Sequence, residues 1–290
     1  MKPIATFSIV GCDLEKQEWG VAVQSKFLAA AAVVSFAQAD TGAVATQSYA
    51  NMDYGPDGLA LMAQGMTAQE VIEQLVGADD DPSGRQVGMV DQHGNAFAYT
   101  GPKCMDWAGH IVGDGFACQG NILIPGTVEA MAAEFERVRG TDGELSDWLV
   151  AALEAGQAAG GDSRGRQSAG VLVVRQNGGY GGRTDRYLDC RVDDDPYPIQ
   201  KLKQIVNKHH VFFGEGDPAN LIPIASVTAD LQAILQKTGH LDLPPTGEFD
   251  DTTRAALRQL IGIENLEHRW NGTGDEIDKT IVEFLKLKFP

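Results

Sequence analysis

The segment 5-ATFSIVGCDLEKQEWGVAVQSKF-27 determines the fold that we expect for this chain. Residues 5–13 and 19–27 both show the alternation of side chains that is typical of a strand, and the residues between them form a polar turn. Two such runs joined by a short polar stretch predict a β-hairpin. We therefore predict that the chain opens with two antiparallel strands and that Thr6 lies at the start of the first.

Further strands and helices follow in separate runs along the chain. The expected strands are residues 31–40, 43–51, 85–101 (a hairpin with its turn at 93–95), 168–177 and 186–194. Within residues 54–79 we expect two helices, the first opened by Pro56 and the second capped by Thr67. Further helices are expected at residues 127–140, 143–161 and 200–214. Because strands and helices are grouped rather than alternating, the pattern predicts an α+β fold, a four-layer αββα sandwich in which helix pairs cover two sheets.

A break rich in Pro, Gly and acidic residues, 215-EGDPANLIP-223, divides the chain in this interpretation. We expect a main domain over residues 1–214, a linker over 215–223 and a small helical domain over 224–290. The small domain reads as helix, turn, helix, with Asp250 and Asp251 at the start of the second helix, where carboxylates suit the helix dipole.

Composition excludes several classes of function. The formal net charge of −17 argues against binding DNA or RNA, because phosphates would be repelled. No apolar run has the length needed to cross a bilayer, and the start of the chain shows no signal peptide, so we predict a cytoplasmic protein that does not bind membranes. The four cysteines lack metal-ligand spacing, and we predict no metal and no cofactor.

Ordered motifs over about residues 5–214 resemble the DUF1028 family. They are GVAVQSKFLAAAAVVSFAQADTGAVATQSYAN, YGPDGL, RQVGMVD, WAGH, CQGNIL, AGQAAGGDSRGRQSAGVLVV, GYGG and DRYLDCRVDD. The resemblance implies an N-terminal-nucleophile hydrolase-like fold, an αββα sandwich. From residue 224 onward, LQAILQKTGHL and TGEFDDTTRAAL resemble a peptidoglycan-binding module.

Thr6 is the candidate nucleophile that this resemblance implies. In such hydrolases the first residue of the mature chain attacks an amide, and its own α-amine takes the hydroxyl proton. Five residues precede Thr6 in the sequence, so cleavage after Ala5 would be needed to free the amine. The alternative is that Thr6 is an ordinary strand residue, since β-branched side chains suit strands.

Three further residues are catalytic candidates. Lys26 could lower the pKa of the nucleophile by its charge, and Ser25 could relay a proton. Asn121, or the N–H of Gly120, could donate a hydrogen bond to a developing oxyanion. The alternatives are a solvated strand end for the first two and an asparagine that satisfies backbone groups for the third.

The substrate-binding candidates are Gln24, Asn51, His110, Asp162 and Arg166. His110 could act near neutral pH, or could be a hydrogen-bonded loop residue. In 161-GDSRGRQS-168 a phosphate-binding loop is excluded, because Arg166 and Gln167 stand where Lys and Ser or Thr are required. Arg166 could grip a substrate carboxylate, or it could pair with Asp162 in an internal clamp between layers.

These observations predict a hydrolase that cleaves amide bonds in a small molecule or peptide. The alternatives are a non-catalytic ligand-binding protein on the same fold and a cell-envelope protein whose tail recognises peptidoglycan. For the tail we rank an interaction role, such as formation of a homodimer, above binding to peptidoglycan, because Trp270 is its only tryptophan available for stacking on sugars.

Overall fold

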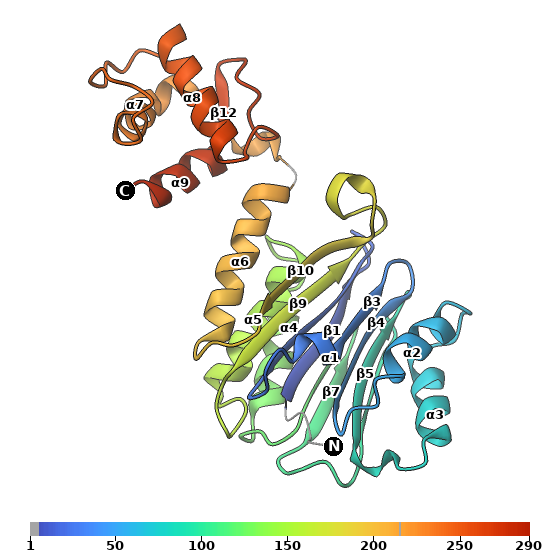
Figure 1. Cartoon of the computed structure of the whole chain (residues 1–290). Coiled ribbons are helices and arrows are strands. Elements are labelled where there is room, and N and C mark those ends of the chain that lie inside the picture. Colours follow the sequence, from blue (N-terminus) through green and yellow to red (C-terminus); the bar gives the residue numbers. More distant parts are fainter. Residues whose placement is uncertain (1–5, 215) are drawn as a thin grey trace. The chain divides into compact units, whose positions relative to one another are not determined.

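The computed structural model describes residues 6–214 and 216–290, and its chain divides into two compact units (Figure 1). Unit 1 is Met1–Val206 and unit 2 is Asn207–Pro290, so the division falls inside helix α6 (Pro198–Phe213). The stretch expected as a linker contains strand β11 (Leu221–Pro223), which pairs with β12 (Glu276–Asp278) of unit 2.

Unit 1 contains a six-stranded sheet in which every neighbouring pair is antiparallel. Its strands, in spatial order, are β10 (Arg186–Val192), β9 (Ser168–Val174), β2 (Glu18–Ser25), β1 (Thr6–Asp13), β8 (Phe116–Gly120) and β7 (Gly109–Gly113). The hairpin predicted from the opening segment is confirmed, because Thr6 pairs with Ser25 and Asp13 with Glu18.

The second sheet of unit 1 has four antiparallel strands. In spatial order they are β3 (Ser35–Gln38), β4 (Gly42–Ser48), β5 (Arg85–Asp91) and β6 (Ala96–Thr100). The helices of unit 1 are α1 (Ala31–Val34), α2 (Tyr54–Met62), α3 (Ala68–Ala78), α4 (Thr127–Val138), α5 (Leu145–Ala158) and the first part of α6.

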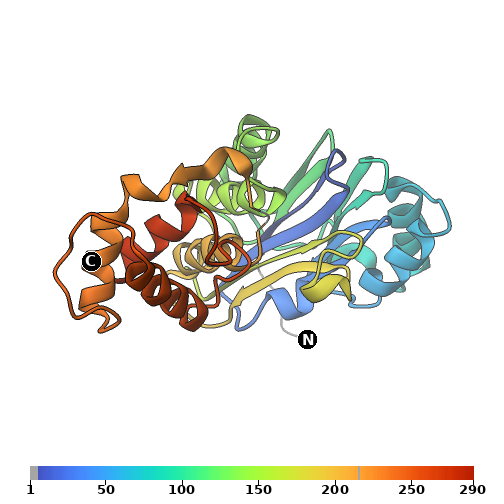
Figure 2. The ribbon, with the colours of Figure 1, turned by 90° about the horizontal axis from the view of Figure 1, so that it is seen from above.

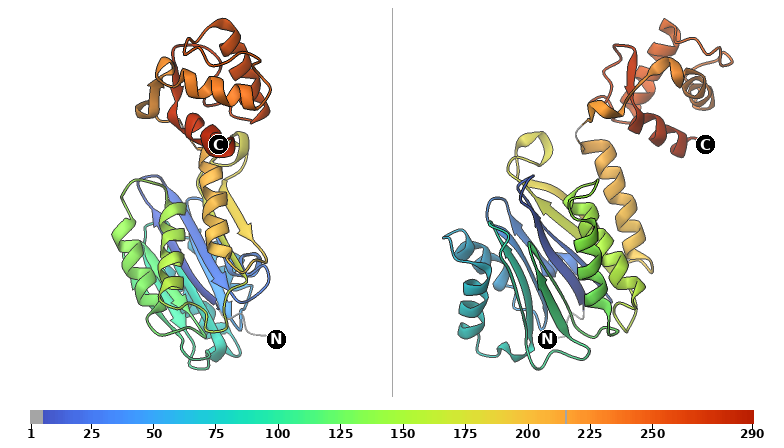
Figure 3. Two further views of the ribbon diagram at one scale, coloured as in Figure 1. Left: turned by 90° about the vertical axis from the view of Figure 1, so that its left-hand side faces the viewer. Right: turned by 180° about the vertical axis from the view of Figure 1, so that it is seen from behind.

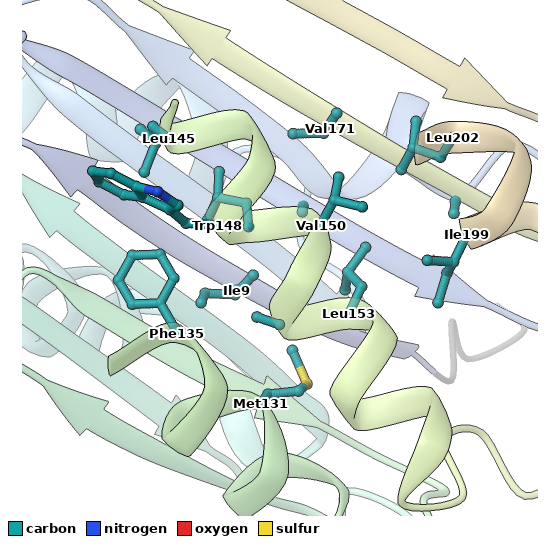
Figure 4. Close-up of a cluster of buried hydrophobic side chains, with 14 of the residues drawn as sticks. Ile9, Met131, Phe135, Leu145, Trp148, Val150, Leu153, Val171, Ile199 and Leu202 are labelled. Carbon is teal, nitrogen blue, oxygen red and sulfur yellow. The ribbon is translucent and has the colours of Figure 1, made fainter. Parts of the chain in front are cut away.

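Three buried apolar layers hold these elements together. One lies between the sheets and includes Val10, Val23 and Val90. A second lies between the six-stranded sheet and α4, α5 and α6, and Figure 4 shows its cluster of buried side chains, from Phe135 and Met131 at one end to Ile199 and Leu202 at the other. The third lies beneath α2 and α3 and is formed by nine buried side chains: Val44, Tyr54, Leu59, Met62, Ala68, Val71, Ile72, Val87 and Met89.

The order of the layers is therefore helices, sheet, sheet, helices, which confirms the αββα sandwich. Figure 3 shows α2 and α3 (light blue) and α4 and α5 (green) on opposite sides of the strands, and Figure 2 shows the same arrangement from above. Burying one large apolar side chain is worth about 1.5–3 kcal/mol, so these layers supply most of the stability of unit 1.

Local signals explain where the helices begin and end. The Thr67 side chain accepts from the Glu70 backbone N–H, and the Glu70 carboxylate accepts from the Thr67 N–H, so the predicted cap at Thr67 is a complete capping box. Beyond α4 the chain turns at Gly140, whose φ of +73° lies in the left-handed region that favours glycine.

Two strands and one helix differ from the sequence prediction. Strands β7 and β8, expected as loops around His110 and Asn121, complete one edge of the six-stranded sheet. They were missed because each has five residues, and the edge strand β7 is only partly buried and therefore lacks a strong apolar alternation. Residues 31–34 form the short helix α1 where we expected the start of a strand.

Unit 2 contains α7 (Thr228–Lys237), α8 (Asp251–Ile263) and α9 (Lys279–Lys288) around one apolar cluster. The predicted helix–turn–helix is confirmed, and Asp250 caps α8 by accepting from the Thr253 N–H. Trp270 is 5 % exposed and packs edge-on against Phe249 inside this cluster. The indole is therefore part of the core of unit 2.

Two buried polar residues fix the irregular segments of unit 2. The side-chain amide of Gln232 hydrogen-bonds five groups of the segment 246–253. Arg269 forms a buried ion pair with Asp278 at 2.7 Å and also donates to backbone carbonyl groups of residues 210, 211 and 214. Among the described residues of both units, no helix is long and apolar enough to span a membrane.

Candidate functional site

The site begins with the alternation of side chains along β1. Phe7 and Ile9 point towards α4 and α5, whereas Val10 belongs to the layer between the sheets. Because side chains alternate along a strand, Thr6 and Ser8 face the four-stranded sheet together with Val10. Both are fully buried, so the apolar layer between the sheets becomes polar where β1 begins.

We call this polar end of the inter-sheet space the polar layer. It consists of eight residues, namely Thr6, Ser8, Gln47, Gln86, Thr100, His110, Gln119 and Asn121. Three come from the four-stranded sheet and five from the six-stranded sheet or the residue that follows β8. The layer therefore adds hydrogen bonds between two sheets whose contact elsewhere is mainly apolar.

One half of the polar layer is a relay of hydrogen bonds through Ser8. The amide of Gln119 donates to the Ser8 hydroxyl at 2.7 Å, and that hydroxyl donates to Oε1 of Gln47 at 2.6 Å. Gln47 Nε2 in turn lies 2.9 Å from Oε1 of Gln86. The approach is close: a Cβ added at Gly88 would lie 2.1 Å from Oε1 of Gln119, so a larger residue at this position of β5 would force the Gln119 side chain to move.

The other half is organised by Gln86. Its Oε1 accepts from Gln47 Nε2 and from Asn121 Nδ2, both at 2.9 Å. Its Nε2 lies 3.0 Å from the Thr100 hydroxyl oxygen and within hydrogen-bond distance of two backbone carbonyl groups of β7 and β8, Gly109 O at 3.2 Å and Gly120 O at 2.7 Å. One side chain of β5 thus contacts both strands at the edge of the opposite sheet.

Thr6 is held at the centre of this arrangement by its backbone. Its carbonyl oxygen accepts from the Asn121 N–H at 3.0 Å and from Gln47 Nε2 at 3.4 Å. Its hydroxyl is buried and has no hydrogen-bond partner among the residues that the structure describes. A buried hydroxyl in that condition is uncommon, because leaving a buried polar group unpaired costs about 1–3 kcal/mol.

Ser25 is the cross-strand neighbour of Thr6. The two residues are paired in the register of β1 and β2, and Ser168 of β9 follows next in the same row. Side chains that oppose each other on one face have Cβ atoms about 4.5–5.5 Å apart. The structure therefore brings together three of the predicted catalytic residues, Thr6, Ser25 and Asn121, around one end of β1.

His110 is a strand residue of β7 rather than the loop residue that we expected. Its Nδ1 lies 2.9 Å from the Thr100 hydroxyl oxygen, which already accepts from Gln86, so the hydroxyl hydrogen is available to Nδ1. The neutral ring then carries its proton on Nε2. Partial desolvation lowers the pKa of the imidazole. His110 is the one member of the polar layer with an ionisable side chain of the acid–base type that can work without strong acid or base.

The chain is strained beside two members of the polar layer. Ser48, which follows Gln47, has φ of +65°, and Ile122, which follows Asn121, has φ of +55°. Such a conformation costs of order 1–3 kcal/mol for a residue with a side chain, and it is concentrated at functional sites. Both residues lie where the chain leaves a regular strand, directly after a member of the polar layer.

Gln24 and Lys26 lie apart from the polar layer. Gln24 pairs with Phe7 in the register of β1 and β2, so its side chain faces α4 and α5, on the opposite side of the sheet from Thr6. It is fully buried, and its amide has no partner among the described residues. Lys26 is exposed, and its ammonium donates to the Arg166 carbonyl at 3.3 Å.

Asn51 belongs to a separate cluster beneath α2 and α3. Its amide and the Tyr54 hydroxyl both donate to Oδ2 of Asp79, at 3.1 and 2.9 Å. The Arg85 guanidinium grips the same carboxylate with two hydrogen bonds, and this pairing holds the pKa of Asp79 well below its usual range. Asn51 therefore orients the junction between α3 and β5.

The expected clamp at Asp162 exists, but its arginine is Arg164. The Arg164 guanidinium forms two hydrogen bonds with the buried Asp162 carboxylate, at 3.1 and 2.8 Å, and the Lys26 N–H donates to the same group. The Arg166 guanidinium instead lies over the ring of Tyr197, 4.9 Å from its centroid. The alternative in which Arg166 pairs with Asp162 was therefore wrong, because the tight turn folds the nearer arginine back onto the carboxylate.

The sequence analysis missed five members of the polar layer. They are Ser8, Gln47, Gln86, Thr100 and Gln119. The available signal was a polar residue on the inward face of each strand, in register with apolar neighbours such as Val10 and Val90. No cluster of His, Cys, Asp and Glu among residues 6–214 and 216–290 has the composition of a metal site.

The two sheets and the helices that cover them define the class: unit 1 is an αββα sandwich. The chain belongs to the DUF1028 family, described as a family of unknown function, whose model matches residues 6–202. A second model, described as "Putative peptidoglycan binding domain", matches residues 212–285. Both resemblances drawn from the motifs are thereby confirmed.

Solved structures extend the comparison. A DUF1028 protein from Silicibacter pomeroyi is 26 % identical with a TM-score of 0.64, over 74 % of this chain and 89 % of that one. Anbu, the ancestral β-subunit from Yersinia bercovieri, is 14 % identical with a TM-score of 0.31, over 70 % of this chain and 94 % of that one. The second likeness is too weak to bear on this chain. Among curated proteins, none matches it.

Proposed function

We propose that unit 1 is a hydrolase of amide bonds in a small molecule or peptide and that Thr6 is its nucleophile. The observation that carries the proposal is the Thr6 hydroxyl, which is buried at the start of β1 and has no partner among the described residues. Ser25 and Asn121 lie beside it, as a proton relay and a possible oxyanion donor would.

The composition of the polar layer favours the α-amine of Thr6, rather than a side chain, as the base. Its members are amides and hydroxyls apart from His110, and His110 contacts Thr100 rather than Thr6. No carboxylate or lysine of the layer can therefore take the proton of the Thr6 hydroxyl. The α-amine of Thr6 would supply that base, because a free amine has a pKa of about 8 and lies within reach of its own hydroxyl.

The amine becomes free only when the bond between Ala5 and Thr6 is broken. In the proposed reaction the Thr6 hydroxyl oxygen attacks the Ala5 carbonyl carbon, the C–N bond breaks, and the hydroxyl proton passes to the Thr6 nitrogen. Water then hydrolyses the resulting ester, releasing a carboxylate at Ala5 and restoring the hydroxyl. In turnover the same oxygen attacks the substrate amide, the α-amine carries its proton to the departing amine, and water cleaves the acyl-enzyme ester.

Intact mass and N-terminal sequencing of the purified full chain test the proposal directly. We expect a species that starts at Thr6 and hydrolyses members of a panel of amides. Thr6→Ala should be neither processed nor active, whereas Thr6→Ser should retain part of both activities. Thr41→Ala is the matched control, because Thr41 is also buried but directly precedes β4, at the end of that strand away from Gln47. Full turnover by Thr6→Ala would contradict the proposal.

A second candidate is a ligand-binding protein without catalytic activity. It is favoured by the hydrogen bonds among Ser8, Gln47 and Gln86, which satisfy much of the polar layer from within. Wild-type protein that remains uncleaved and inactive on every amide, yet binds one of them, would select this candidate over the hydrolase.

For unit 2 we propose an accessory role in binding, separate from catalysis. The match of residues 212–285 supports peptidoglycan as a partner. Because Trp270 is buried, recognition would depend on hydrogen bonds rather than on stacking of that indole against sugars. A pull-down of the full chain with insoluble peptidoglycan, together with light scattering, separates this partner from a homodimer. Retention without dimerisation selects peptidoglycan, and the reverse selects the homodimer.

A further inference from the structure

We propose that Gln86 is a positioning residue for the Thr6 site, acting from the four-stranded sheet through Asn121 and Gln47. This inference rests on the proposed function, since it concerns the reactivity of Thr6. Gln86 hydrogen-bonds Gln47 and Asn121 rather than Thr6, so its effect passes through the two residues that hold the Thr6 carbonyl oxygen.

The geometry of Gln86 defines this role. Its Oε1 is a common acceptor for the side-chain amides of Gln47 and Asn121. Gln47 Nε2 also lies 3.4 Å from the Thr6 carbonyl, and the Asn121 backbone N–H donates to the same oxygen at 3.0 Å. One atom of β5 thus contacts both residues that hold the Thr6 carbonyl oxygen, although β5 belongs to the opposite sheet.

The amide nitrogen of Gln86 completes the arrangement. It is within hydrogen-bond distance of the carbonyl oxygens of Gly109 and Gly120, which belong to β7 and β8. The chain continues from Gly120 into Asn121, so this contact fixes the end of β8 from which Asn121 projects. A side chain at position 86 must accept on one side and donate on the other. A carboxamide does both at any pH, whereas a carboxyl group donates only when it is protonated.

A purely structural amide provides the matched comparison. Gln232 of unit 2 is also buried, and its Nε2 likewise contacts three oxygens while its Oε1 accepts from two N–H groups. The two glutamines have the same number of hydrogen bonds, although Oε1 accepts from side-chain amides in Gln86 and from backbone N–H groups in Gln232. They differ in what those bonds hold: a loop of unit 2 in one case and the surroundings of Thr6 in the other.

The experiment follows the processing of full-length protein after Ala5 by intact mass over time. Wild type is compared with Gln86→Met, Gln86→Glu and Gln232→Met, at a temperature where circular dichroism shows each variant folded. We expect Gln86→Met to be processed at least tenfold more slowly and Gln232→Met to remain within twofold of wild type. Gln86→Glu keeps the acceptor but gains a donor only when protonated, so its rate relative to wild type should rise as the pH falls from 8 to 5.

The outcomes separate this inference from the proposed function. Processing of folded Gln86→Met at the wild-type rate would overturn the role of Gln86 and leave the role of Thr6 intact. Should Gln86→Met fail to fold, a pH-independent ratio for Gln86→Glu would overturn it instead. Absence of processing in wild type would overturn the proposed function first, and this inference with it.

Discussion

Glu18 should make the stability of unit 1 fall as the pH rises. This carboxylate lies at the start of β2, has no exposed side-chain surface, and pairs with Arg175 at 3.0 Å through one oxygen only. Its second oxygen has no partner among the described residues. Burial is the main cause that raises the pKa of Glu18 from 4.5 to about 7, against the opposing effect of the Arg175 charge.

The magnitude follows from linkage. A group with a higher pKa in the folded than in the unfolded chain binds its proton more tightly when folded, so its contribution to stability is complete below pH 4.5 and is lost as the pH rises through 7. That interval corresponds to about 3 kcal/mol of unfolding free energy. Glu18→Gln keeps the shape without the charge and should not show this loss.

The assay is chemical denaturation of wild type and Glu18→Gln between pH 4.5 and pH 8. Wild type should lose about 3 kcal/mol relative to the variant over this range. Glu15→Gln, an exposed glutamate on the adjacent turn, controls for the removal of one negative charge. Because unit 2 is identical in all three proteins, its contribution cancels. Stability curves for wild type and Glu18→Gln that run parallel across this range would refute the reasoning.

Three further changes should alter stability in ways that thermal or urea denaturation measures. Gly88→Ala would place a Cβ 2.1 Å from Oε1 of Gln119 and should cost about 1–3 kcal/mol; an unchanged midpoint would show that the sheets can separate locally. Arg269→Met should destabilise unit 2 by about 3–5 kcal/mol, because its buried carboxylate partner is left unpaired. Arg164→Ala should lower the melting temperature more than Arg166→Ala does, and the opposite order would restore the clamp first expected.

Local features of the fold were predictable because they depend on neighbours in sequence. The opening hairpin followed from alternation and a polar turn, and the Thr67 cap followed from Glu70 three residues later. The short strands β7 and β8 were not predictable in the same way. The pairing of β8 with β1 and of β7 with β8 is decided by tertiary contacts, since strands of five residues carry little periodic signal.

The candidate site was predictable only in part for the same physical reason. Thr6 was identified by its place at the start of the first predicted strand, and Asn121 as an amide within the motif CQGNIL. Gln47, Gln86 and Gln119 lie on three different strands, and each looks like an ordinary polar residue in its own segment. The Gln47–Gln86 hydrogen bond depends on the pairing of β4 with β5, and the bond from Gln47 to the Gln119 carbonyl depends on the packing of the two sheets, so no single stretch of the sequence encodes them.

The neutrality of the polar layer has a consequence for how the protein responds to salt. Mobile ions screen charges over about 8 Å at physiological ionic strength, but they have little effect on hydrogen bonds between buried amides. The net charge of −17 makes encounters with charged partners sensitive to salt. Chemistry among Thr6, Gln86 and Asn121 should instead proceed at nearly the same rate at low and at high salt concentration. Salt would then change how the protein meets charged partners without changing the rate of the reaction in its interior.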